Sequence, residues 1–205
     1  MRHLGDITKI DGSKIEKVDA VTFGAPCQDI SVANRNRAGM KHEKRGDDET
    51  TRSGLFFDAV RVIKEMRESD RADGRTDEFI RPRYAVYENV PGALSSNGGQ
   101  DFAAVLTELI KIAEPQAPDV PVPKNGWPKS GCLYDEMGRW SIAFRVHDAQ
   151  FWGAAVYSDD GILLQQGTPQ RRRRIAVVAD FGGTSAPEIL FVRKGKTGNI
   201  ETSDE

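Results

Sequence analysis

The sequence has few cysteines, no long apolar run and almost no net charge. Cys27 and Cys132 are its two cysteines, which is too few for a disulfide framework, and no CxxC or His/Cys spacing predicts a zinc site. No stretch approaches the roughly 18 apolar residues that a membrane span needs, and the first residues lack the apolar core of a signal peptide. We therefore expect no metal and no membrane partner, and a cytoplasmic location.

The small net charge also limits the kind of partner that the chain can attract over a distance. A formal charge of −2 gives no overall attraction to nucleic acid, so such binding would need local basic patches. The length of 205 residues predicts one medium-sized domain with a sizeable core. A hydrophobic fraction of 38% with 29% charged residues is typical of a globular chain and not of a disordered one.

Hydrophobic periodicity predicts alternating strands and helices. A β-branched run at 18–23 and the run at 84–87 indicate buried strands, and further strands are expected at 140–146 and 174–178. Apolar residues at helical spacing predict helices at 53–67 and 100–113. This order favours an α/β layer fold with a mainly parallel sheet, helices on both faces and a terminal strand pair.

Three segments fall outside this regular pattern. Residues 33–52 are polar, mixed in charge and aperiodic, and a loop of that length is more often functional or mobile than idle. Residues 154–167 predict a strand, a turn and a strand, and hence a β-hairpin. Residues 194–205 form a polar tail that we expect to be frayed.

Side chains that could take part in catalysis follow the first two predicted strands. Cys27 lies in the stretch Gly24-Ala25-Pro26-Cys27-Gln28, and Glu88 begins Glu88-Asn89-Val90. In parallel sheets ligands bind outside the carboxyl ends of the strands, so both side chains are expected in one crevice. Taken singly, however, a cysteine after a strand is more often a small core residue than a nucleophile. A lone glutamate or a run of four arginines is usually a solvated surface feature.

The order of these motifs is similar to that of the DNA (cytosine-5) methyltransferase family. The chain has a Pro-Cys-Gln after a strand, then Glu-Asn-Val, then Gln170-Arg171-Arg172-Arg173-Arg174, which resembles the family's Gln-x-Arg-x-Arg. Three further stretches resemble the motifs that surround these: Gly-Asp-Ile at 5–7, Arg-Ser-Gly-Leu-Phe-Phe at 52–57 and Asp-Ala-Gln-Phe-Trp-Gly at 148–153. The resemblance covers about residues 3–192.

The resemblance implies a Rossmann-like methyltransferase fold and a covalent mechanism on cytosine. Cys27 would add as a thiolate to C6 and make C5 nucleophilic, while Glu88 would protonate or hydrogen-bond N3. Arg172 and Arg174 would hold the base and Glu88 in place. The methyl group would come from S-adenosyl-L-methionine and the substrate would be double-stranded DNA, in a bacterial or phage setting such as restriction-modification.

The resemblance also assigns supporting residues. It places four residues on the cofactor side of the site, namely Asp6, Ile7, Pro26 and Leu55. It gives support of the substrate and its loops to a second set, comprising Gly24, Gln28, Ser31, Asn89, Val90 and Gln170. Residues 33–52 would form the mobile catalytic loop, whose cations reach DNA phosphates while the target base is flipped out of the helix.

Two departures from the family pattern set further expectations. No glycine-rich cofactor loop precedes Asp6, and neither the target-recognition region nor the closing motifs follow Phe191. Residues 1–193 are therefore expected to be a partial catalytic domain with an incomplete S-adenosylmethionine pocket. The extra residues 154–167 are expected to be an inserted hairpin. Alternatives are an inactive remnant, one half of a split enzyme that needs a complementary chain, and a tRNA-directed cytosine-5 methyltransferase.

Overall fold

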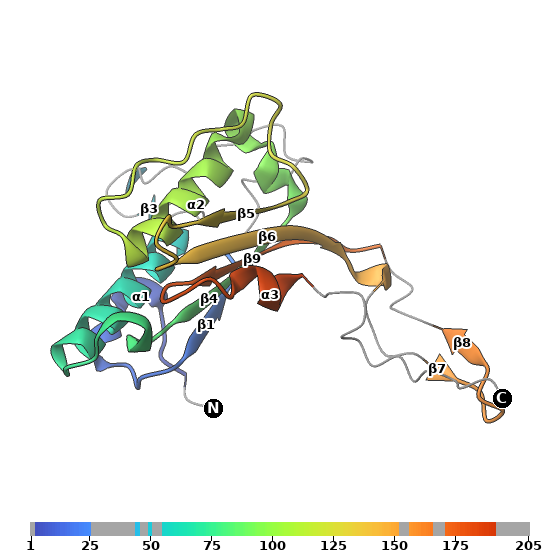
Figure 1. The fold of residues 1–205 in the computed structure, drawn as a ribbon, viewed down its shortest axis with the longest axis horizontal. Helices are drawn as coiled ribbons and strands as arrows, with labels where there is room; N and C mark the ends of the chain where they lie inside the picture. The colour runs from blue at the N-terminus through green and yellow to red at the C-terminus, as the bar shows by residue number, and fades with distance from the viewer. Residues whose placement is uncertain are drawn as a thin grey trace.

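The centre of the molecule is one five-stranded sheet with the strand order β1-β4-β9-β6-β5 (Figure 1). The computed structural model describes residues 3–25, 44–45, 49–50, 55–151, 156–165 and 171–191. The strands of the sheet are β1 (Ala20–Phe23), β4 (Tyr84–Asn89), β5 (Ser130–Tyr134), β6 (Ser141–Asp148) and β9 (Arg173–Asp180). The helices are α1 (Leu55–Ala72), α2 (Gln100–Ala113) and α3 (Ala186–Leu190). The α/β architecture expected from the sequence is confirmed.

The direction of the strands differs from the sequence expectation. Only β1 and β4 are parallel, whereas β4–β9, β9–β6 and β6–β5 are all antiparallel pairs. The expectation of a mainly parallel sheet is therefore wrong. A parallel pair needs a long crossover, which α1 supplies between β1 and β4, whereas the short turn 135–140 joins β5 and β6 as an antiparallel hairpin.

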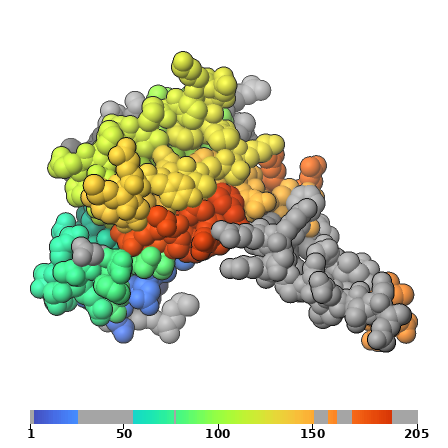
Figure 2. Space-filling model, in the orientation of Figure 1, coloured from blue at the N-terminus to red at the C-terminus, as the bar shows by residue number. Residues whose placement is uncertain are grey.

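Helices cover both faces of the sheet, as expected. Successive side chains of a strand point to opposite faces, so β9 divides its residues between two cores. Ile175, Val177 and Ala179 join the larger core under α1 and α2, while Val178 packs with Ala186 of α3. Figure 2 shows the residues of β9 and α3, in red, lying between the β5–β6 hairpin and the β1–α1 part of the molecule.

Several short elements escaped the sequence prediction. The strand β5 and the helix α3 each contain five residues, too few for periodicity to distinguish them from a loop. Segment 115–131 packs partly on the core: Trp127 contacts Phe102 edge-to-face and donates a hydrogen bond from Nε1 to the Gly99 carbonyl at 2.8 Å. The edge strand β5 then begins at Ser130.

Two small strand pairs lie outside the main sheet. β7 (Val156–Tyr157) pairs antiparallel with β8 (Leu163–Gln165) within segment 154–167 and lies away from the sheet in Figure 1. β2 (Lys44–Arg45) pairs with β3 (Glu49–Thr50) within segment 33–52. The rest of that loop and the tail 194–205 lie outside the described residues. Within the described ranges, no helix combines the length and the apolarity that a bilayer crossing requires.

Candidate functional site

The exit of β1 lies directly beside Glu88. The parallel register aligns Phe23 with Tyr87, so residue 24 follows β1 where Glu88 follows in β4. A Cβ atom added to Gly24 would lie 3.3 Å from the Glu88 carbonyl oxygen and 3.4 Å from Glu88 Oε2. Glycine is therefore the residue that fits this close approach. Glu88 itself lies within β4, which continues to Asn89, and not after the end of the strand as the sequence suggested.

An ion pair joins Glu88 to the first residues of β9. Arg174 Nε lies 2.8 Å from Glu88 Oε1, with 31% of the arginine and 52% of the glutamate side chain exposed. The pair forms because β9 runs antiparallel to β4 with Glu88 opposite Ala176, which brings the start of β9 to the end of β4. Two motifs that are 86 positions apart in the sequence therefore meet on the α3 face of the sheet.

Buried hydrogen bonds hold the backbone that carries Glu88. Asn89 is 2% exposed, donates from its side-chain nitrogen to the Tyr87 hydroxyl, and accepts a hydrogen bond from the Val90 backbone N–H at 2.7 Å. Tyr87 is fully buried against Phe23 and Phe56. The two neighbours of Glu88 thus point into the protein, which leaves the glutamate side chain on the opposite face of the strand.

Arg172 is held by its backbone and not by its side chain. Its N–H donates to Asp148 Oδ1 at 3.1 Å, and its carbonyl accepts from the Ala149 N–H at 3.0 Å. Its side chain is exposed and has no ionic or hydrogen-bond partner within the described parts of the chain. Arg172 and Arg174 therefore differ: Arg174 binds Glu88, while the Arg172 guanidinium binds no carboxylate among the described residues.

Three of the residues expected on the cofactor side, Asp6, Ile7 and Leu55, are described in the structure. Asp6 accepts hydrogen bonds from the Thr8 N–H at 3.0 Å and its hydroxyl at 2.9 Å, which lower the pKa of this exposed carboxyl. The Ile7 carbonyl accepts from Arg61 of α1 at 2.9 Å. Leu55 is the half-buried first residue of α1. The Asp6 carboxylate therefore lies on an exposed turn, and Arg61 joins this turn to α1 through the Ile7 carbonyl.

Five of the expected site residues lie outside the described part of the chain. They are Pro26, Cys27, Gln28, Ser31 and Gln170. Within the described ranges, no group of three or more His, Cys, Asp or Glu side chains is arranged to hold a metal ion. The arrangement thus brings together Gly24, Glu88 and Arg174, at the point where the chain leads toward the Pro-Cys-Gln stretch.

Sequence reasoning missed two residues that organise the site. Tyr87 receives the Asn89 side chain, and Asp148 binds the Arg172 backbone and, through Oδ1, the Gln150 N–H at 3.3 Å. Tyr87 appeared in the sequence only as one apolar residue of a strand. Asp148 appeared only as the first residue of a motif stretch, and its contact with Arg172 spans 24 positions that local patterns do not connect.

Comparison with known proteins gives one family and several partial relatives. The model of the C-5 cytosine-specific DNA methylase family matches residues 2–113. A protein of Escherichia phage P1 named DNA N-6-adenine-methyltransferase is 31% identical over 97% of this chain and 25% of its own length. The DNA (cytosine-5-)-methyltransferase M.ApeKI of Aeropyrum pernix is 27% identical over 92% of this chain and 33% of its own length.

A third relative supports the same grouping. The type II methyltransferase M.BsuFI of Bacillus subtilis is 26% identical over 85% of this chain and 27% of its own length. The chain thus spans about a quarter to a third of the length of these relatives. The family model covers more than half of the chain, including β1, β4 and the helices that pack against them. The chain belongs to the C-5 cytosine-specific DNA methylase family.

Proposed function

We propose that this chain carries the nucleophile and the base-binding groups of a DNA cytosine-5 methyltransferase, and that residues 1–193 are part of its catalytic domain. The observation that carries the proposal is the Arg174–Glu88 ion pair beside Gly24. Cys27 follows Gly24 by three positions along the chain, so covalent geometry limits the distance between their Cα atoms to about 11 Å. A thiolate from Cys27 can therefore act on a base that Glu88 binds.

The proposed chemistry begins with the addition of Cys27 Sγ to C6 of a flipped cytosine. The new S–C6 bond breaks the C5=C6 π bond and moves its electron pair toward C5, while Glu88 donates a hydrogen bond or a proton to N3. Arg174 occupies Glu88 Oε1, so Oε2, which faces Gly24, is the oxygen available to N3. After methylation, loss of the C5 proton to a base expels the thiolate and restores the aromatic ring.

S-adenosylmethionine would supply the methyl group that C5 accepts. Because the Asp6 carboxylate is exposed and already accepts hydrogen bonds from Thr8, we expect the 205-residue chain alone to bind this cofactor poorly. A complementary chain could complete the pocket, and an inactive remnant would lack one. The surface for double-stranded DNA would include Arg172, whose guanidinium binds no described residue.

Adenine methylation is the second candidate, because the phage P1 relative is named for that activity and aligns with 97% of this chain. The matched segment is only 25% of that relative, so the named activity can reside in other parts of it. An attack on C6 by a thiolate serves cytosine chemistry, whereas the exocyclic nitrogen of adenine needs no covalent activation of a ring carbon. We therefore favour cytosine.

The direct test separates addition by Cys27 from methyl transfer. The chain is incubated with duplex DNA tritiated at C5 of cytosine, without cofactor, and release of tritium to water reports addition and reversal at C6. A second experiment uses 5-fluorocytosine DNA with S-adenosylmethionine and looks for a denaturant-resistant protein–DNA adduct. We expect Cys27→Ser to abolish tritium release, together with any adduct that the wild-type chain forms at a high S-adenosylmethionine concentration.

The second cysteine provides the matched control. Cys132 lies on the edge strand β5 and is exposed, so Cys132→Ser should leave tritium release unchanged. Absence of release from the wild-type chain would refute the claim that it works alone. Detection of N6-methyladenine without 5-methylcytosine in DNA modified in cells would refute the assignment to cytosine.

A further inference from the structure

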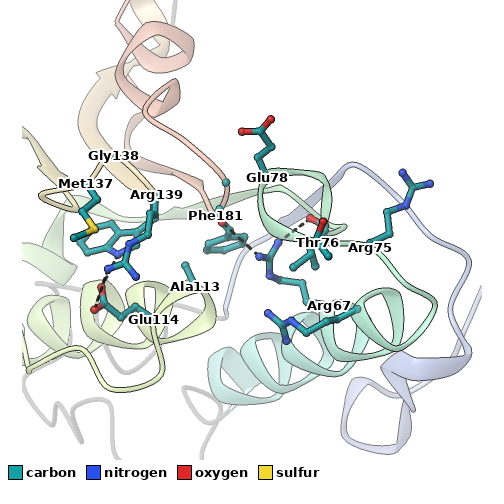
Figure 3. Close-up of a pocket in the computed structure, with 14 residues that line it drawn as sticks. Arg67, Arg75, Thr76, Glu78, Ala113, Glu114, Met137, Gly138, Arg139 and Phe181 are labelled. Carbon is teal, nitrogen blue, oxygen red and sulfur yellow. Dashed lines mark hydrogen bonds and ion pairs between the residues drawn. The ribbon is translucent and has the colours of Figure 1, made fainter.

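A cavity lies at the end of the sheet opposite to Glu88. The antiparallel register pairs Tyr84, the first residue of β4, with Asp180, the last residue of β9, and the cavity opens beyond this end. Its volume is about 620 Å³. The walls come from the last turns of α1, the end of α2, the turn between β5 and β6, and the residues that follow β9 (Figure 3).

Cationic side chains dominate the charge of this cavity. Four arginines line it, namely Arg67, Arg71, Arg75 and Arg139, against two glutamates, Glu78 and Glu114. Arg139 is neutralised, because its Nε lies 2.8 Å from Asp135 and its Nη2 lies 3.4 Å from Glu114. Arg75 points away from the other labelled side chains in Figure 3 and is 3.8 Å from the buried Asp70. In contrast, the Arg71 side chain has no ionic or hydrogen-bond partner within the described ranges.

Arg67 adds a buried positive charge to the wall. It is 4% exposed, and Nη1 donates to the carbonyls of Ile80 at 2.9 Å and Pro82 at 2.6 Å. Its Nε has no hydrogen-bond partner in the described structure, and no described carboxylate lies within ion-pair distance of it. Burial and the neighbouring Arg71 lower the pKa of Arg67 to about 10, so the group is still charged at neutral pH. A charge so placed favours an anion nearby.

The other side of the cavity combines apolar side chains with one ion pair. Met137 and Ala113 lie on this side in Figure 3 together with Arg139 and Glu114. The Trp140 ring is fixed, because its Nε1 donates to Glu114 Oε2 at 2.9 Å. Met137 is 83% exposed, so its flexible thioether side chain can cover a ligand. One wall thus offers cations, and the facing wall offers Met137 and Ala113 beside the Arg139–Glu114 ion pair.

We propose that this cavity binds a small organic phosphate of about the size of a mononucleotide. The phosphate would bind Arg71, with the buried positive charge of Arg67 behind it, and the flat organic part would lie against Met137. The volume falls within the range of about 300–1,000 Å³ that is usual for small-molecule sites. The site is separate from Glu88 and Arg174, and its occupancy does not depend on the methyltransferase reaction.

The plain structural explanation of Arg71 is that it stabilises the end of α1. A cation in the last turn of a helix offsets the partial negative charge of the final carbonyl groups. That role would lower the melting temperature when Arg71 is neutralised, but it would create no affinity for phosphate. The two explanations therefore differ in a binding measurement.

The test uses calorimetric titration of the 205-residue chain with AMP and with pyrophosphate, together with the melting temperature. We expect saturable binding of both ligands and a rise in melting temperature with ligand concentration. Arg71→Gln should weaken the affinity for each of the two ligands at least about tenfold, because a charge-assisted hydrogen bond is lost. Met137→Ser should weaken the binding of AMP and leave the affinity for pyrophosphate unchanged. The matched control Lys124→Gln, an exposed cation outside the cavity, should change neither.

Three results would overturn the proposal. The first is no saturable binding of either ligand to the wild-type chain. The second is binding that Arg71→Gln does not weaken, with only a lower melting temperature, which would leave Arg71 as part of the helix end. The third is displacement of AMP by a short DNA duplex, which would assign the surface to a polynucleotide backbone.

Discussion

The two ends of the β4–β9 pair each carry an arginine–carboxylate contact, and the two contacts differ in almost every physical respect. At one end, Arg174 of β9 binds Glu88 of β4 through a single 2.8 Å contact, and half of the glutamate side chain is exposed. At the other end, Arg83 binds Asp180 through two contacts, of 2.8 and 3.0 Å, and Asp180 is fully buried.

The difference lies in how many groups hold each carboxylate. Asp180 also accepts hydrogen bonds from the Gly182 N–H at 3.0 Å, the Ser185 N–H at 3.1 Å and the Ser185 hydroxyl at 2.6 Å. These bonds tie the end of β9 to the start of α3. Among the described residues, Glu88 has a partner on one carboxylate oxygen, and its other oxygen is directed toward Gly24. A carboxylate with all its acceptor sites used stabilises a fold, whereas one with an open site can bind a substrate.

The largest expected effect is on stability at the buried end. Asp180→Ala should lower the free energy of unfolding by about 3–5 kcal/mol, because it removes five hydrogen bonds and leaves Arg83 without its partner. Urea denaturation followed by circular dichroism measures the change. Glu88→Ala is the matched variant and should cost less than about 1 kcal/mol, since the pair is exposed. Equal losses of unfolding free energy in the two variants would contradict the proposed difference between the two carboxylates.

The next effect is on chemistry at the exposed end. Glu88→Gln and Arg174→Gln should each reduce tritium release from cytosine by about 10²–10⁴-fold, the usual size of a lost acid–base contribution. Their unfolding curves should overlay that of the wild-type chain within about 1 kcal/mol. Arg83→Gln provides the reverse control, with lower stability but the same release per folded molecule. Normal release from Arg174→Gln would remove the ion pair from the mechanism.

Acid pH should distinguish the buried carboxylate further. Burial raises the pKa of Asp180, but hydrogen bonds from Arg83, Ser185 and Gly182 outweigh it and hold the pKa below the ordinary 3.8. A pKa that is lower in the folded state contributes stability above about pH 3.8, and this contribution is lost as pH falls through the folded value. The stability difference between wild type and Asp180→Asn should therefore shrink below pH 4. A difference that grows on acidification would contradict this sign.

The smallest effect should come from Gly24→Ala. The added Cβ would lie 3.3 Å from the Glu88 carbonyl oxygen and 3.4 Å from Oε2, so the backbone at Glu88 must shift by a few tenths of an ångström and carry the carboxylate with it. We expect a loss of about tenfold in tritium release, because small misplacements of reacting groups reduce rates, with stability nearly unchanged. Gly74→Ala, at a turn where no atom lies within 4 Å of the new Cβ, controls for strain outside the site.

Local sequence patterns predicted the long elements well. The helix at 100–113 was expected with the bounds that α2 has, because an apolar stripe fills it, a glycine precedes it and Pro115 closely follows it. The helix expected at 53–67 continues to Ala72 as α1, because Met66, Arg67 and Asp70 are also buried on its inner face. Short elements such as β5 and α3 have too few residues for a period to appear.

Local patterns in the sequence predicted that the segments of Gly24 and Glu88 lie close together, but they did not predict that Arg174 binds Glu88. The chain places Gly24 and Glu88 after or within two strands joined by a single helix, and parallel strands bring such residues to the same edge of a sheet. The partner Arg174 depended on a pairing that no local pattern indicates. The sheet order places β9 between β4 and β6, so its start meets Glu88 only once the whole sheet has formed.

The sequence by itself determined the family, the ordered motifs and the crossover that links β1 to β4, because these depend on residue identity and short-range periodicity. Only the tertiary structure decided the antiparallel direction of most of the sheet and the open state of Glu88. It also decided the burial of Asp180 and Arg67. These features depend on contacts between residues far apart in the chain, such as the 97 positions between Arg83 and Asp180. Burial and hydrogen-bond partners, rather than residue type, make one carboxylate structural and leave the other available for chemistry.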